Sequence, residues 1–240
     1  LAMLSWGEQG HRITGDIARM VTKKEIQDSV KKYLGKTKWG EAATWMDEVR
    51  GDRKYDHMTP WHYINIGRDS DYVKNNEENV VNEIQRIMDT LQHHRSKLSK
   101  EEIGIYIKVL FHLIGDMHQP LHVGYGVDRG GNDISVDFLG RSSNLHKVWD
   151  TEIIVETKIT TSSLKERYSK IKTAELKQIN TLDVVAWMNE GRAFLPGVYD
   201  FSKDIITRAY VDKNAEIIKT RLLYGGFRIS SVLTAIFSNP

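Results

Sequence analysis

The sequence predicts a mainly α-helical, single-domain globular protein; the helical class follows from the residue pattern, and the single globular domain from composition and length. Apolar residues at helical spacing or strong helix formers fill ten segments, whereas alternating, strand-like patterns are rare. Hydrophobic residues make up 40% and charged residues 28% of the chain, which is ordinary for a globular protein. With 240 residues, the chain is long enough for one large core. The predicted helices cover residues 11–21, 23–34, 41–50, 77–98, 101–118, 144–156, 163–171, 174–190, 202–210 and 213–235.

Residues 122–143 differ from this helical pattern. Five glycines interrupt the segment, and Ile134-Ser-Val-Asp-Phe138 alternates like a short strand. We therefore expect a loop with a small β-hairpin here. No low-complexity linker divides the chain, so we expect one domain over residues 6–240.

Charge and cysteine content limit the classes of function. The net charge of +2 is too small to indicate a nucleic-acid or membrane partner by itself. No apolar stretch is long enough to span a bilayer, and we expect no stable membrane association. The chain has no cysteine, which excludes disulfides and thiolate metal sites. Any zinc must therefore be held by nitrogen and oxygen.

The most informative segment is His112-Leu-Ile-Gly-Asp116-Met-His118-Gln-Pro-Leu-His122. A second pair follows in Asn144-Leu-His146-Lys-Val-Trp-Asp150. Residues four apart share one face of a helix, so each pair presents an imidazole and a carboxylate together. Zinc binds such ligands, and a catalytic zinc keeps a position open for water. Any single histidine is more often a core or surface residue, but this density predicts a polynuclear metal site.

Further candidate ligands are scattered along the first quarter of the chain. His11 opens the first predicted helix, Asp47 lies in a helical segment and His62 follows Trp61. Taken singly, each residue is weak evidence for a metal site, because Asp47 could be a solvated helix carboxylate and His62 an ordinary packing residue. The remaining histidines in polar surroundings, which we expect at the surface, are His57, His93 and His94.

The order of these motifs resembles the S1/P1 nuclease family of zinc-dependent nucleases. The resemblance runs from Trp6 to nearly the C-terminus and implies the helical fold of the phospholipase C/P1 nuclease type, with three zinc ions in one cleft. The matching motifs are Trp6-Gly-x-x-Gly-His11, Trp45-Met-Asp47, Trp61-His62-Tyr-Ile, His112-x-x-x-Asp116-x-His118-Gln-Pro-Leu-His122, Gly130-Gly-Asn132, Asn144-Leu-His146-x-x-Trp-Asp150 and Trp187-Met-Asn-Glu190.

The resemblance also implies a role for each matching residue. The family's zinc ligands fall on Trp6 (through its backbone), His11, Asp47, His62, His112, Asp116, His122, His146 and Asp150. Asp116 would bridge two ions and is a catalytic residue in this scheme. Arg50 matches an arginine near the scissile phosphate, although an ion pair with Asp47 or Glu48 is the alternative. His118 is no ligand in the family, and we expect it to support or pack against the site.

Substrate recognition by the family rests on aromatic residues, because unpaired bases expose their faces. Tyr63 matches an aromatic residue at the base pocket, and Tyr125 is a second candidate by proximity alone; packing is the alternative for both. Asn65 stands where some relatives carry an aspartate proposed as a general base. An amide cannot accept a proton in that role.

The implied reaction is hydrolysis of single-stranded DNA or RNA to 5′-phosphorylated products, with 3′-nucleotidase activity as its companion. Nucleic acids and nucleotides are the implied partners, and no obligate protein partner is implied. The family also implies a secreted or periplasmic location, and the absence of cysteine is closer to its bacterial branch. Two alternatives remain: a zinc-dependent phospholipase C, and a helical protein that binds zinc without catalysis.

Residues 1–5 resemble the end of a secretory signal or an N-terminal extension. Family members begin at the tryptophan, whose free amine binds zinc, whereas an amide nitrogen is a poor ligand. We therefore expect the third zinc site to be impaired, and we predict that removing residues 1–5 raises the bound zinc by about one equivalent. Metal analysis of both forms tests this, and equal zinc contents would contradict it.

Overall fold

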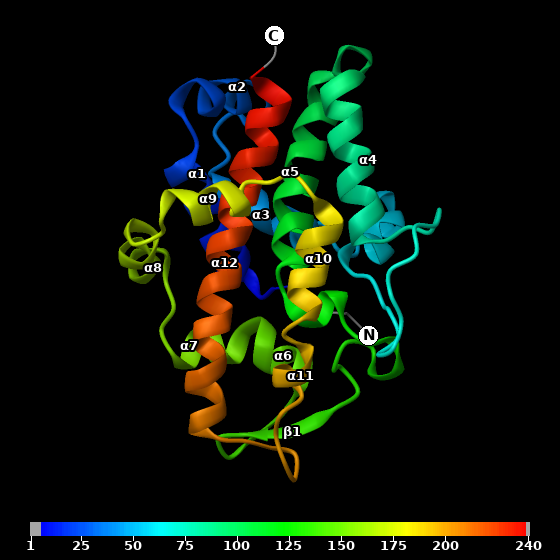
Figure 1. Cartoon of the computed structure of the whole chain (residues 1–240). Helices are drawn as coiled ribbons and strands as arrows, with labels where there is room; N and C mark the ends of the chain where they lie inside the picture. Colours follow the sequence, from blue (N-terminus) through cyan, green and yellow to red (C-terminus); the bar gives the residue numbers. More distant parts are fainter. Residues whose placement is uncertain (1–5, 239–240) are drawn as a thin grey trace.

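The computed structural model describes residues 6–238, most of which are helical (Figure 1). This confirms the predicted fold class. The α-helices are α1 (Glu8–Val21), α2 (Lys24–Leu34), α3 (Trp39–Glu48), α4 (Val80–His93), α5 (Lys100–Met117), α6 (Leu145–Lys147), α7 (Ile153–Glu156), α8 (Thr161–Ser169), α9 (Thr173–Ile179), α10 (Val184–Arg192), α11 (Leu195–Val198) and α12 (Arg208–Phe237). Short 3₁₀ segments are η1 (Arg53–His62), η2 (Arg95–Lys97), η3 (Pro120–Val123) and η4 (Gly126–Asp128), and η5 (Val148–Glu152) is a π-helical turn.

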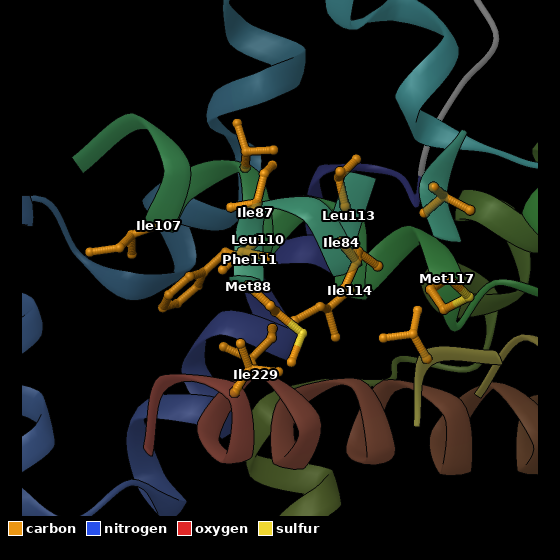
Figure 2. Packing of buried hydrophobic residues seen from close by; sticks show 14 of the residues in the cluster. Ile84, Ile87, Met88, Ile107, Leu110, Phe111, Leu113, Ile114, Met117 and Ile229 are labelled. Carbon is orange, nitrogen blue, oxygen red and sulfur yellow. The ribbon is translucent and has the colours of Figure 1, made fainter. Parts of the chain in front are cut away.

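The apolar core has two parts that meet along α12. One part joins α4 and α5 to the C-terminal half of α12, where Ile87, Leu110 and Ile229 pack together (Figure 2). The other joins α1, the small sheet and α6–α7 to the N-terminal half of α12. Helices α1 and α12 approach closely because Gly226 has no side chain; a Cβ there would lie 2.5 Å from Cγ2 of Ile17.

The small sheet confirms the predicted hairpin and adds a strand. Strands β1 (Ser135–Phe138) and β2 (Arg141–Asn144) pair antiparallel around a two-residue turn in which both residues have positive φ. The short strand β3 (Ile205–Ile206) pairs in parallel on the other side of β1. The sequence patterns do not predict β3, because its partner lies about 70 residues away in the chain.

Two predicted helices are wrong. The segment 174–190 forms α9 and α10, because the Asp183 carboxylate accepts a hydrogen bond from the Ala186 amide and begins a new helix. In the predicted helix 202–210, residues 202–207 contain β3, and only the last three residues are helical, as the start of α12. Lys203 and Asp204 both have positive φ, which no right-handed helix accommodates. The patterns also do not predict η1 or α11.

The predicted helix over residues 144–156 is present but irregular. It consists of α6, the π-helical turn η5 and α7, without an intervening loop. Within residues 6–238, no helix is both long enough and apolar enough to cross a membrane.

Two buried arginines of α12 attach it to α10 and to the end of α5. Arg221 donates hydrogen bonds to the carbonyl of His118 (3.1 Å) and to Glu190 (3.1 Å). Arg228 makes a bidentate pair with Glu190 at 2.6 and 2.7 Å, and also donates to Nε2 of His118 at 2.8 Å. One half-exposed carboxylate therefore neutralises two buried cations.

We predict that Glu190→Gln destabilises the fold by about 2 kcal/mol, below the usual loss for a buried pair because Glu190 is half-exposed. Burial raises the pKa of Glu190, but Arg228 and Arg221 together lower it below 4.5. The carboxylate's contribution is therefore complete above pH 4.5 and is lost as the pH falls through the lower, folded-state pKa. Urea unfolding of both proteins at pH 7 and in acid should show a difference that shrinks in acid. An equal difference in unfolding free energy at both pH values would contradict a contribution from the ionised Glu190 carboxylate.

Candidate metal centre

Helix α5 places His112 and Asp116 one turn apart with both side chains fully buried. Their Nε2 and Oδ2 atoms are 3.2 Å apart. Nδ1 of His112 lies 2.7 Å from the carbonyl oxygen of Ala43 in α3, so that nitrogen carries the proton and Nε2 faces Asp116. The helical spacing read from the sequence thus presents two donors side by side.

Helices α1 and α3 add His11 and Asp47 to this pair. The ring of His11 stacks on that of His112 with centroids 3.8 Å apart, and its Nε2 lies 3.2 Å from Oδ1 of Asp116. This approach requires Gly115, because a Cβ there would lie 2.9 Å from Nδ1 of His11. Asp47 places Oδ1 at 3.9 Å from Nε2 of His112.

His62, at the end of η1, completes the first group. Its Nδ1 lies 2.9 Å from Oδ2 of Asp116 and 3.1 Å from Nε2 of His112. Burial lowers the pKa of His62 to about 4, so the ring is neutral near pH 7. Burial also acts on Asp116, but the surrounding imidazoles outweigh it and hold the pKa of this carboxyl well below its usual value. The result is an ionised carboxylate among imidazole nitrogens.

His122, His146 and Asp150 form a second group. Nε2 of His146 lies 3.1 Å and Nε2 of His122 3.8 Å from the Asp150 carboxylate. Backbone carbonyls fix both rings, since Nδ1 of His122 meets the His62 oxygen at 2.8 Å and Nδ1 of His146 meets the Gly130 oxygen at 2.7 Å. Asp150 lies in the π-helical turn η5, a kind of irregularity common at functional sites.

Trp6 lies between the two groups. Its buried indole donates a hydrogen bond to the Gly115 carbonyl at 2.7 Å, next to Asp116. The following amide, of Gly7, donates to the Asp150 carbonyl at 3.0 Å. The predicted effect of residues 1–5 on a third zinc site concerns residues outside the described part of the chain.

Three sets of donors within residues 6–238 are close enough to share an ion. In each set, all the ligand atoms lie within 4.8 Å of one another. The sets are His11–Asp47–His112, His62–His112–Asp116 and His122–His146–Asp150. They contain every side chain that we predict as a ligand. The family resemblance implies that Asp47 shares one ion with His62, His112 and Asp116, and that His11 belongs to another ion. Here Asp47 lies in one set with His11 and His112.

The donor set fits metal ions, and several buried polar atoms otherwise lack hydrogen-bond partners. Among the described residues, these atoms include both ring nitrogens of His11, Oδ1 of Asp116 and Oδ2 of Asp150. Each such group costs roughly 1–3 kcal/mol when left unsatisfied. Nitrogen and carboxylate oxygen donors match zinc, and a bound cation would satisfy these atoms.

Arg50 lies at the edge of the site. Its guanidinium is 2.8 Å from Oδ1 of Asp47, which is the ion pair considered as the alternative to a phosphate contact. Both side chains are about 30% exposed, so the arginine remains accessible from solution. With His62, Arg50 lines a small pocket beside the metal donors.

The other predicted substrate residues differ in exposure. Tyr63 is partly exposed, and Asn65 is exposed and lies next to Gly126 of η4. Tyr125 is only 7% exposed, and its ring packs against Tyr199 at 5.4 Å. In this conformation Tyr125 is placed for packing and not for stacking on a base.

Two residues of the central motif support the ligands. His118 is buried, with Nδ1 at 2.6 Å from the Ile114 oxygen and Nε2 accepting from Arg228. Gln119, which the sequence did not single out, donates from Nε2 to Oδ1 of Asp150 at 2.7 Å. The only signal for Gln119 was its place between two candidate ligands.

Comparison with known proteins agrees with this geometry. The S1/P1 nuclease family model matches residues 6–238. The chain belongs to the S1/P1 nuclease family. This confirms the resemblance read from the motifs, and the chain is accordingly a nuclease.

Relatives within the S1/P1 nuclease family cover nearly the whole chain. Endonuclease 4 of Arabidopsis thaliana is 29% identical over 98% of this chain and 90% of its own length. Nuclease S1 of Aspergillus oryzae is 25% identical over 98% of this chain and 93% of its own length. The crystal structure of Clostridium perfringens alpha-toxin has a TM-score of 0.49 at 14% identity, over 97% of this chain and 62% of the toxin chain. That likeness is too distant to bear on the substrate.

We predict that Asp116→Asn in this S1/P1 nuclease lowers the metal content more than His146→Ala does. Asp116 faces His11, His62 and His112, whereas His146 belongs to one group only. Zinc per protein, measured by atomic absorption after dialysis, tests the difference. Asp89→Asn, at an exposed carboxylate of α4, is the control and should change nothing. Equal losses in the two site variants would argue against a shared carboxylate.

Proposed function

We propose that the chain is a zinc-dependent endonuclease that cleaves single-stranded DNA and RNA to 5′-phosphorylated products, with 3′-nucleotidase activity as its companion. The observation that supports this best is the connected set of buried histidines and aspartates, in which His112 belongs to two donor groups. A connected set favours several ions acting on one phosphate over an isolated structural ion. We also propose a secreted or periplasmic location, on the family resemblance alone.

We propose three zinc sites held by these donors. When bound, zinc ions supply an acidified water and neutralise phosphate oxygens. The first site takes Asp47, His62, His112 and Asp116; the second takes His122, His146 and Asp150; the third takes His11, Asp116 and the Trp6 backbone.

The protein's own groups then orient the substrate. Arg50 has a planar fork of donors beside Asp47, and this geometry suits a phosphate as well as a carboxylate. Such donors act most strongly on charge that grows in the transition state. Gln119 and three backbone carbonyls keep the ligands oriented when substrate enters.

Base recognition falls to Tyr63 in this proposal. It directly follows the ligand His62 and is partly exposed, which leaves an aromatic face available for stacking. Asn65 is exposed, and its amide cannot serve as a general base. Proton removal therefore does not depend on residue 65.

We predict that Arg50→Ala lowers kcat/KM on single-stranded DNA by about 100-fold, the usual effect of losing one donor to the transition state. Arg50→Lys should restore little, because an ammonium cannot reproduce the fork. Zinc content must be measured in parallel, since Arg50 also holds Asp47. Full activity with full zinc would contradict a role for Arg50.

The test of the proposed function is hydrolysis of single-stranded DNA by the purified chain, before and after EDTA and after zinc is restored. Zinc-dependent cleavage with 5′-phosphate ends is the expected result. Duplex DNA and phosphatidylcholine vesicles are the comparison substrates. Hydrolysis of the lipid alone would identify a phospholipase C, and tightly bound zinc with no hydrolysis would identify a non-catalytic zinc protein.

A further inference from the structure

A hollow rich in cations lies at the ends of α1 and α3 that are remote from the metal donors. It has a volume of about 420 Å³ and is bounded by the last turn of α1, by α2 and by residues 35–38. Five cationic side chains line this basic hollow: Arg19, Lys24, Lys31, Lys36 and Lys38. None of them belongs to the metal centre described above.

The carboxylates in the basic hollow do not balance these charges. Asp28 forms an ion pair with Lys24, one turn earlier in α2. Asp16 lies in the field of Arg19 and Lys38, and a Glu41 oxygen lies 3.9 Å from Nζ of Lys38, so these two cations are compensated in part. Within residues 6–238, Lys31 and Lys36 have no carboxylate oxygen within 4.0 Å.

The surrounding segment is the most basic part of the chain. Residues 19–38 hold seven basic and two acidic residues and carry a charge of +5, whereas the whole chain carries only +2. The remaining residues therefore carry −3 together. A field of this kind attracts polyanions, while the average charge of the molecule does not.

The basic hollow is within reach of a chain that is bound at the metal centre. Lys38 precedes α3, and Asp47 lies nine residues further along. At 1.5 Å per residue, this separation is about 14 Å along the helix axis. Proteins that bind single strands commonly follow the backbone with a positively charged surface over several nucleotides.

We infer that the basic hollow is an accessory site for the phosphodiester backbone of a single-stranded nucleic acid, distant from the bond being cleaved. The inference rests on the proposed nuclease function. It separates two properties of the enzyme: the metal centre acts on one phosphate, and the hollow retains the rest of the strand. Long substrates should then bind better than dinucleotides, because the hollow adds contacts that take no part in the cleavage step.

The test compares the zinc-loaded enzyme with the charge-reversal variant Lys31→Glu/Lys36→Glu. We expect KM for a single-stranded 30-mer to rise about ten-fold, with kcat unchanged and with the KM for a dinucleotide unchanged. For the 30-mer, the slope of log(kcat/KM) against the logarithm of the salt concentration should become shallower by about 1.4. Each of the two lost lysine–phosphate contacts contributes about 0.7 to this slope. Lys172→Glu/Lys177→Glu is the matched control, because both lysines are exposed and lie outside the hollow, one directly before α9 and one within it.

The outcomes are distinguishable from those that test the nuclease proposal. Failure of the unmodified enzyme to cleave the dinucleotide and the 30-mer would overturn the proposed function and this inference with it. Cleavage of both, with equal KM values for the 30-mer in the two double variants, would overturn the accessory site alone. Loss of binding to anionic vesicles, with an unchanged KM for the 30-mer, would instead assign the hollow to a membrane surface.

Discussion

The structure depends on one buried carboxylate, that of Asp116. It lies between the imidazoles of His11, His62 and His112, which come from three separate parts of the chain. A fully buried carboxylate is tolerated only where partners compensate its charge. The packing of α1, α5 and η1 around it is therefore a condition for folding as well as for binding metal. Gly115, one residue before it, leaves the room that His11 needs.

The sequence predicted most of the site because much of it is local. His112 and Asp116 share a helix face, and their relation follows from the helical repeat alone. His11, Asp47 and His62 could be recognised only from the order of motifs, since no periodicity links them to α5. Their actual neighbours, including the closeness of Asp47 to His11, follow from how α1 and α3 cross.

What the sequence could not predict is set by tertiary contacts. The backbone oxygens that orient the histidine rings belong to Ala43, His62 and Gly130. Every residue has a backbone carbonyl, so the sequence does not indicate which of them will contact a histidine. The wrong helix at 202–210 has a similar cause. Two consecutive residues with positive φ allow β3 to reach β1, although the side chains there fit a helix.

The π-helical turn at Val148–Glu152 has a consequence for how this enzyme can change through evolution. A π turn holds one residue more than an α turn, so deletion of one residue would convert the segment into a regular helix without breaking it. The helix would then be more regular, but a deletion between His146 and Asp150 would change the spacing of these two side chains from four residues to three. Asp150 lies within this turn, between His146 and the packed segment α7. The irregularity therefore fixes the length of the segment: substitutions are tolerated there more easily than any insertion or deletion.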